Sequence, residues 1–234
     1  MRTYLLRYRE QALTALVIVE ALWLFVLAPL TQLHVFPVAV NILITVVIVA
    51  IVLVICSGNR VAELAIIGAT LVDVAAESMH VVLPSRVTVG FDLAARIVFF
   101  AALIWIVAVR VFGPGRVTVH RIQGAIAIEL TLAMMFALVF RSLDLLTNYA
   151  AFHQTVTQAV TQAVTHQQHS GAHSFGNYVY FSLTTLTSTG YGDTTPIHPF
   201  ARSIANLEAL IGQLFPATLL ARLVSLEIES RRSV

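Results

Sequence analysis

The stretch Thr187-Ser188-Thr189-Gly190-Tyr191-Gly192-Asp193 decides how the C-terminal half of this chain must fold. Glycine enters the left-handed backbone region without steric cost, so Gly190 and Gly192 permit a backbone that alternates between ordinary and left-handed residues. Such a backbone turns successive carbonyl oxygens toward one line, where they can replace the water around a cation. Within a bilayer, extended backbone survives only where protein buries it or where it lines a watery path. The stretch is therefore a candidate lining for an ion path.

The composition of the chain indicates a membrane protein. Hydrophobic residues make up 58% of the 234 residues and charged residues only 11%, which is too little polar surface to cover a soluble domain. The net charge of +2 is too small to indicate nucleic acid as a partner, and all 14 basic residues are arginines scattered over the chain. The single cysteine, Cys56, excludes an intramolecular disulfide and a cysteine-based metal site.

Six segments are long and apolar enough to cross a bilayer as helices, because a hydrocarbon core of about 30 Å takes about 20 helical residues. These segments are residues 12–33, 36–56, 61–83, 91–112, 122–146 and 200–228. With a cytoplasmic N-terminus, most arginines lie on the inner side, as the positive-inside rule requires. We therefore expect an all-α integral membrane protein with six transmembrane helices, surrounded by lipid. Both termini should lie in the cytoplasm, and residues 190–193 should lie on the extracytoplasmic side.

The central motif resembles the selectivity filter of the potassium-channel family, which reads Thr-x-Gly-Tyr-Gly-Asp after a short pore helix rich in threonine. The resemblance implies that K⁺ binds to the carbonyl oxygens of Ser188, Thr189, Gly190 and Tyr191 and to the Ser188 hydroxyl. It implies that Gly192 completes the filter and that Asp193 stands at the outer mouth. Ser188 replaces the family's threonine and loses a methyl group. Thr189 replaces valine or isoleucine, so it stays β-branched but gains a hydroxyl that needs a partner.

The same resemblance implies a homotetramer, because a ring of carbonyl oxygens needs four strands and this chain supplies one. It implies passive conduction of potassium, with K⁺ as the permeant ion and no cofactor. The sequence contains no Ser-His-Asp set, phosphate-binding loop, redox cysteine pair or metal-ligand spacing, so we do not expect an enzyme.

By this resemblance the chain divides into three parts: a four-helix sensor-like bundle (1–112), a cytoplasmic linker (113–121) and a pore domain (122–230). Inside the pore domain, a polar turret (148–173), a re-entrant pore helix (175–187) and the filter (188–192) lie between the fifth and sixth helices. The pore helix would aim its negative C-terminal end at the pore centre, which favours a cation there.

The turret contains four histidines, which suggests a metal site or a proton sensor. No carboxylate ligand accompanies them at helical spacing, so a solvated, low-complexity loop is the interpretation that we favour. The four residues are His153, His166, His169 and His173.

Several side chains are expected to support the filter or to gate it. The supporting set is Tyr180, Phe181, Thr184, Thr187 and Glu208. Tyr180 and Phe181 occupy the places of the family's aromatic cuff, with simple interfacial aromatics as the alternative. Glu208, an intramembrane carboxylate, is expected to accept a hydrogen bond from Thr189 or from a pore-helix threonine such as Thr184.

The last span carries a predicted gate. Gly212 stands where pore-lining helices of the family carry a hinge glycine, although close helix packing explains a glycine there equally well. Pro216 removes one backbone hydrogen bond from the helix, so we expect the helix to bend near it.

The first four spans resemble the sensor domain of six-helix channels in number and order. A working voltage sensor repeats arginine at every third position of its fourth helix, whereas this chain has one embedded charge there, Arg96. One such charge in each of four subunits gives at most about 9 kcal/mol per 100 mV, which predicts weak or absent voltage dependence. We expect Arg96 to pair with Glu77 or Asp73, and the alternative is a proton or ion path through the bundle.

Three other functions remain open: a less selective monovalent cation channel, an ion transporter of potassium-channel ancestry, and a nonconducting membrane assembly subunit. The first would follow if Ser188 and Thr189 loosen the filter. Arginine-only basicity and the short chain suggest a bacterial plasma membrane as the location.

Overall fold

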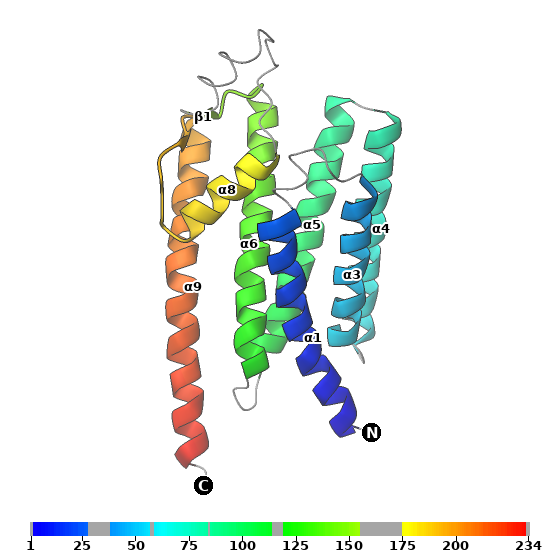
Figure 1. The fold of residues 1–234 in the computed structure, drawn as a ribbon, viewed down its shortest axis with the longest axis vertical. Helices are drawn as coiled ribbons and strands as arrows, with labels where there is room; N and C mark the ends of the chain where they lie inside the picture. Colours follow the sequence, from blue (N-terminus) through cyan, green and yellow to red (C-terminus); the bar gives the residue numbers. More distant parts are fainter. Residues whose placement is uncertain are drawn as a thin grey trace. The chain divides into compact units, whose positions relative to one another are not determined.

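A computed structural model describes residues 2–27, 38–56, 59–83, 85–113, 119–154 and 175–232. The elements in chain order are α1 (Arg2–Leu22), the π-helical turn η1 (Trp23–Leu27), α3 (Val38–Cys56), α4 (Arg60–Val82), α5 (Arg86–Val111), α6 (Val119–Leu146), β1 (Phe152–Gln154), α8 (Phe175–Leu186), β2 (Thr194–Pro196) and α9 (Pro199–Arg232). The fold is therefore almost entirely helical, as the sequence predicts (Figure 1).

Three of the helices in the described ranges are long and apolar enough to cross a membrane. They are Arg86–Val111, Val119–Leu146 and Pro199–Arg222, which coincide with the fourth, fifth and sixth predicted spans. Two shorter apolar helices, Gln11–Leu27 and Leu43–Cys56, overlap the first and second predicted spans. The six-span layout as a whole stays a prediction.

The chain forms two compact units. One contains Met1–Met135 together with Ala217–Val234, and the other is Phe136–Pro216. The second unit is shorter at both ends than the predicted pore domain, 122–230, because α6 and α9 each run from one unit into the other. The predicted division at 113–121 stays a prediction.

In the first unit, α4 packs against α5, and α3 packs against both α1 and α4. Two of these helices begin at N-capping residues. Ser85 and Thr88 form a capping box at the start of α5, in which each side chain accepts a hydrogen bond from the other residue's backbone N–H (3.1 and 2.9 Å). The Asn59 side chain caps α4 by accepting from the N–H of Ala62.

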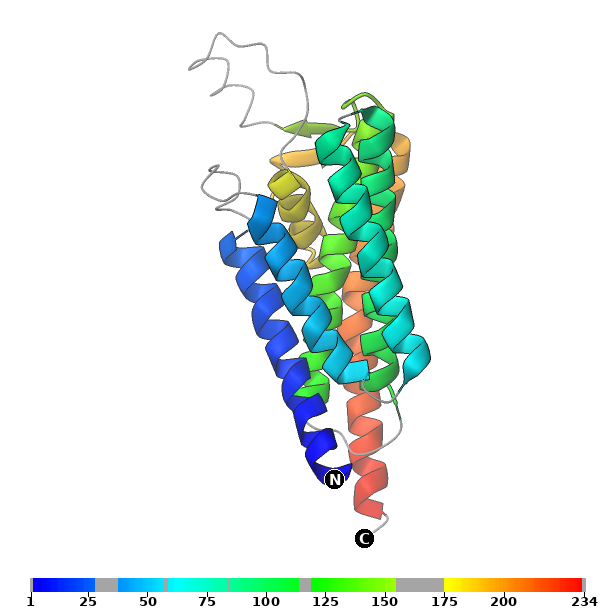
Figure 2. The ribbon, with the colours of Figure 1, turned by 90° about the vertical axis from the view of Figure 1, so that its right-hand side faces the viewer.

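In the second unit, a two-stranded antiparallel ribbon and a short helix are held between longer helices. β1 pairs with β2 in the register Phe152↔Pro196, His153↔Thr195 and Gln154↔Thr194, so the segment after the filter is tied back to the segment after α6. In the view of Figure 1, α8 runs obliquely from the C-terminal part of α6 toward the N-terminal part of α9, and in Figure 2 it lies to one side of both helices. The ribbon and α8 thereby hold both ends of the filter stretch.

The predicted turret, 148–173, falls mostly outside the described residues. Its first part is not a loop throughout, because Phe152–Gln154 forms β1 and carries His153. The other three histidines, His166, His169 and His173, lie outside the described residues, so the interpretation of this cluster stays a prediction.

Candidate functional site

The backbone of the filter stretch alternates between two conformations. Ser188, Gly190 and Gly192 have φ values of +55°, +51° and +78°, so every second residue is left-handed. The sequence predicts this for the two glycines but not for Ser188. An L-residue in this region costs roughly 1–2 kcal/mol, and such strain persists only where the surrounding structure holds it.

The backbone N–H groups of the filter stretch bond back to the end of α8. The Thr184 carbonyl accepts from the N–H groups of Thr189 (2.8 Å) and Gly190 (3.1 Å), and the Thr185 carbonyl accepts from Ser188 (2.9 Å). Within the described part of the chain, no hydrogen bond reaches the carbonyl oxygens of residues 188–191, which belong to exposed residues of the single chain. These three N–H groups are thus satisfied by the helix end, and the carbonyl oxygens remain available to other ligands.

The hydroxyl groups of Ser188 and Thr189 have hydrogen-bond partners inside the second unit. The Thr189 hydroxyl lies 2.9 Å from the Thr187 hydroxyl, which is the partner that the sequence required but did not identify. The Gln213 side-chain amide on α9 donates to the Ser188 hydroxyl at 2.9 Å. Gln213 is not among the residues predicted from the sequence, since a single glutamine in an apolar span gives no signal of its own.

Glu208 is fully buried on α9, and the Ser182 hydroxyl on α8 donates to its carboxylate. The expectation that Thr189 or Thr184 is the donor is wrong, because the Thr184 hydroxyl donates to the Phe181 carbonyl at 3.0 Å. Spacing explains the difference. Ser182 lies one turn before Leu186 on α8, just as Glu208 lies one turn before Gly212 on α9, and Leu186 is the residue that Gly212 contacts.

Gly212 permits a close approach between the two helices. A Cβ atom at this position would lie 2.0 Å from the carbonyl oxygen of Leu186 and 2.8 Å from its carbonyl carbon. This contact supports the packing interpretation of Gly212, while the hinge stays a prediction. α9 continues through Pro216 as one helix to Arg232, and the gate role of Pro216 likewise stays a prediction.

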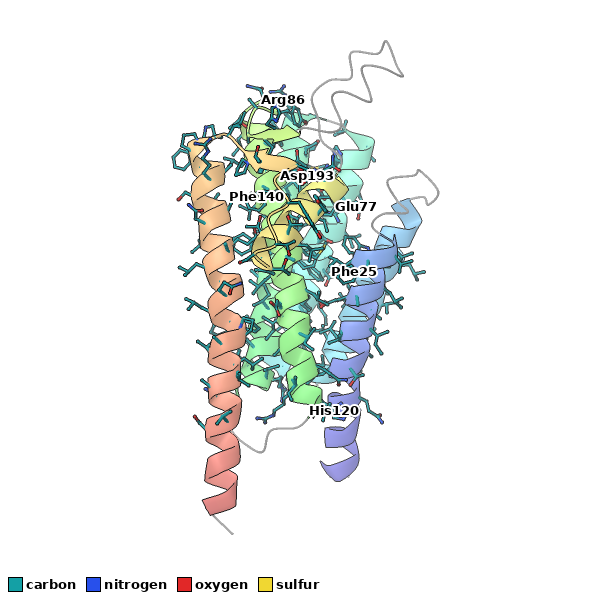
Figure 3. The ribbon with its side chains drawn as sticks, turned by 60° about the vertical axis from the view of Figure 1, so that its left-hand side comes forward. Phe25, Glu77, Arg86, His120, Phe140 and Asp193 are labelled. Carbon is teal, nitrogen blue, oxygen red and sulfur yellow. The ribbon has the colours of Figure 1, made fainter. Side chains whose placement is uncertain are left out.

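The two predicted cuff aromatics have different surroundings. Tyr180 is partly exposed and stacks on Tyr191, with ring centroids 6.3 Å apart and an angle of 6° between the rings. Its hydroxyl also interacts with the carboxylate of Asp193. That carboxylate accepts a hydrogen bond from the N–H of Thr194, and Asp193 is labelled in Figure 3. Tyr180 therefore links the outer part of the filter to the residue at the predicted mouth.

Phe181 is buried in an aromatic cluster that holds α8 against α6 and β1. Its ring lies 5.0 Å from Phe140 and 5.2 Å from Phe152 between centroids, both in edge-to-face geometry. Phe140 and Phe152 also meet edge to face at 5.6 Å, and Phe140 is labelled in Figure 3. The cluster fixes the helix from which the filter stretch leaves.

A buried polar network accompanies this cluster. Asp144, at the end of α6, accepts from the Tyr178 hydroxyl (2.5 Å) and from the N–H of Ala151 (2.9 Å). Burial and the neighbouring Asp144 raise the pKa of the Tyr178 hydroxyl, so it stays protonated and able to donate. Asp144 is not among the residues predicted from the sequence, although an aspartate at the end of an apolar span is a usable signal.

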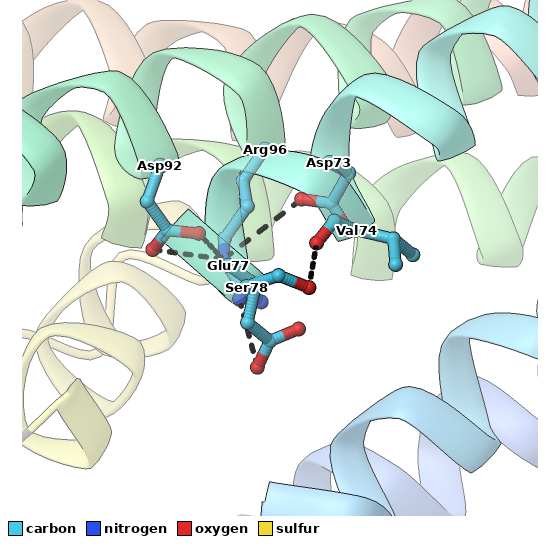
Figure 4. Close-up of polar contacts among 6 residues, drawn as sticks. All are labelled: Asp73, Val74, Glu77, Ser78, Asp92 and Arg96. Carbon is cyan, nitrogen blue, oxygen red and sulfur yellow. Dashed lines mark hydrogen bonds and ion pairs between the residues drawn. The ribbon is translucent and has the colours of Figure 1, made fainter. Parts of the chain in front are cut away.

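Arg96 in the first unit forms an ion-pair cluster with three carboxylates. Its guanidinium lies 3.3 Å from Glu77 and 3.9 Å from Asp73, both on α4, which confirms the expected pairing (Figure 4). The third partner, Asp92, lies one turn earlier on α5, at 3.2 Å. Asp92 is not among the partners predicted from the sequence, even though the i, i+4 spacing favours such a pair.

Residues 130–228 match a protein-family model described as "Ion channel". The match includes the C-terminal part of α6, α8, the filter stretch and most of α9. No curated protein and no solved structure matches the chain significantly. The match and the long apolar helices support a membrane protein, and the description of the family model points to passive ion conduction.

Proposed function

We propose that this protein is a homotetrameric potassium channel in which the carbonyl oxygens of residues 188–191 and the Ser188 hydroxyl bind the permeant ion. Gly192 ends the filter, and Asp193 stands at its outer mouth. The ion is the only ligand that the mechanism requires, and membrane lipid surrounds the assembly.

The observation that carries this proposal is the alternating backbone at Ser188, Gly190 and Gly192. The Thr184 and Thr185 carbonyls accept hydrogen bonds from the N–H groups of residues 188–190, so α8 satisfies one edge of the stretch. The opposite edge presents carbonyl oxygens without a partner in the described part of the chain. Carbonyl oxygens in this arrangement are suitable ligands for a dehydrated monovalent cation.

Four copies are needed because one such edge cannot surround an ion. In a cyclic tetramer, each chain makes the same contact with the ion. Closed symmetry of this kind is usual in homo-oligomers. The exposure of Tyr191 and of the filter carbonyls in the single chain is consistent with partners from other copies.

The surrounding contacts supply the rigidity that selective binding needs. The Phe181 cluster, the Asp144–Tyr178 bond and the Glu208–Ser182 bond all fix α8, whose C-terminal carbonyls hold the filter. Tyr180 ties Tyr191 and Asp193 together at the other end. A site held from both ends keeps its geometry when an ion enters or leaves.

Voltage should have little influence on this channel. The single embedded arginine, Arg96, is paired with carboxylates on its own helix and on α4. Its movement through the membrane field would leave those carboxylates buried and unpaired, which opposes displacement. We place the channel in a plasma membrane, with both termini in the cytoplasm.

Ion flux from liposomes that contain only the purified protein tests this function. Potassium flux well above sodium flux is expected, and Gly190→Ala should abolish it. An added Cβ at Gly190 meets no atom within 4 Å in the chain, so the loss would come from the left-handed φ of +51°. The matched control is Gly68→Ala on α4, where the Cβ also meets nothing and φ is ordinary.

Equal flux of potassium and sodium would favour the less selective cation channel, in which Ser188 and Thr189 loosen the filter. Absence of flux from a folded tetramer would favour the nonconducting assembly subunit. If a potassium gradient alone does not drive flux and a second solute is required, the result would favour a transporter.

A further inference from the structure

We infer that Gln213 is a specificity-determining residue of the filter. Its side-chain amide holds the Ser188 hydroxyl in one orientation and thereby sets the affinity of the innermost cation site. This inference rests on the proposed function, because it assumes that Ser188 is an ion ligand.

The contact depends on the packing of α9 against the end of α8. Gln213 directly follows Gly212, whose missing side chain lets α9 approach the Leu186 carbonyl. From this position the Gln213 amide reaches the Ser188 hydroxyl, 25 residues earlier in the chain, at 2.9 Å. Both residues are exposed in the single chain, so the pair can face an ion path.

The Ser188 hydroxyl needs a hydrogen-bond partner to fix its orientation more than the Thr189 hydroxyl does. Threonine is β-branched and therefore stiff at χ1, and the Thr189 hydroxyl already has a partner in Thr187. Serine has no branch at Cβ, and three staggered χ1 positions are open to it. A hydrogen bond to Gln213 selects one of them.

The donor direction leaves the serine oxygen able to bind a cation. A hydroxyl oxygen has two lone pairs, and the Gln213 amide uses only one of them. If the three χ1 positions were otherwise equally populated, fixing one would raise cation affinity up to about threefold per chain. In four equivalent chains the upper bound is roughly eighty-fold, since the factors multiply.

The test measures cation binding by the full-length protein in detergent. A ligand that binds only the folded state raises the melting temperature, so a potassium titration gives an apparent affinity. The proteins compared are the wild type, Gln213→Leu, Ser188→Ala and the double variant. The matched control is Gln123→Leu, which makes the same change and also removes one side-chain hydrogen bond, to Thr14, outside the filter.

We expect Gln213→Leu to weaken potassium binding by between threefold and roughly eighty-fold. The double variant should bind like Ser188→Ala, because Gln213 acts through that hydroxyl. Gln213→Glu, which can accept a hydrogen bond from Ser188, should restore affinity to the wild-type level or above. Gln123→Leu should leave the affinity unchanged.

Additive effects of the two single changes, or wild-type affinity in Gln213→Leu, would overturn the inference. Should Gln213→Leu fail to fold, Gln213→Asn replaces it, because the shorter amide cannot span the same distance. Flux measured on the same preparations separates the two proposals. If the wild type binds potassium but shows no flux, the conducting function is contradicted, and the binding data still test the role of Gln213. If potassium does not stabilise the wild type, the role of Gln213 itself is overturned.

Discussion

Gly212 and Leu186 approach so closely that a Cβ atom on Gly212 would lie 2.0 Å from the Leu186 carbonyl oxygen. This obstacle is backbone, and it cannot rotate away as a flexible side chain would. The same helix end supplies the carbonyls that hold the filter stretch. We therefore expect that any widening between α8 and α9 would shift the carbonyls that hold the filter stretch.

Gly212→Ala should destabilise the folded protein and reduce potassium flux. Overpacking of this kind costs about 1–3 kcal/mol, which corresponds to roughly 2–12 °C in melting temperature for a chain of this size. Thermal unfolding in detergent measures the shift, with Gly68→Ala as the control. A variant with unchanged melting temperature and altered channel opening would instead identify Gly212 as a hinge.

Ser182→Ala should destabilise the protein through Glu208. The substitution removes the donor to a carboxylate that is fully buried, and an unsatisfied buried group costs about 1–3 kcal/mol. Ser225→Ala is the matched control, because the exposed Ser225 hydroxyl on α9 donates to the Ala221 carbonyl of its own helix. Equal melting temperatures for the two variants would contradict a bracing role for Glu208.

Tyr178→Phe should also destabilise the protein, by about 1–3 kcal/mol, because buried Asp144 loses a hydrogen-bond donor. Tyr180→Phe provides the comparison, since the Tyr180 side chain is partly exposed and water can replace its hydroxyl. Melting temperatures of both variants, measured side by side, check this prediction. A larger loss for Tyr180→Phe would contradict it.

The Tyr178 bond also predicts a dependence on alkaline pH. Burial first and the Asp144 contact second raise the pKa of Tyr178 above its ordinary value near 10. The folded state then keeps a proton that the unfolded state releases, so this stability is complete below pH 10 and is lost as the pH rises further. Melting curves from pH 8 to 11 should fall less steeply for Tyr178→Phe than for the wild type.

Arg96→Gln should be severely destabilising, because it leaves three carboxylates in a mostly buried cluster without their cation. Removing one partner from a buried ion pair costs about 3–5 kcal/mol. Arg60→Gln, at an exposed position at the start of α4, is the matched control. A well-folded Arg96→Gln protein whose currents lose a steep voltage dependence would show that Arg96 is a gating charge and not a structural one.

Prediction from sequence succeeded where the signal is local. Apolar length identified three spans, and the two glycines identified left-handed positions in the filter stretch. Arg96 was matched to Glu77 and Asp73 because an embedded charge needs a partner, whereas the local partner Asp92 was overlooked. The sequence predicts a threonine as the donor to Glu208, whereas the donor is Ser182. The composition of α8 does not show which of its faces is turned toward α9.

The sequence by itself determined that this chain enters a membrane and where its backbone can turn carbonyl oxygens outward, because both depend on short runs of residue types. Only the tertiary structure decided which side chains support that backbone. Gln213 meets Ser188 across 25 residues, and Tyr178 meets Asp144 across 34. Such contacts depend on the distance and rotation between packed helices, which Gly212 and the Phe181 cluster set here and which no local pattern encodes.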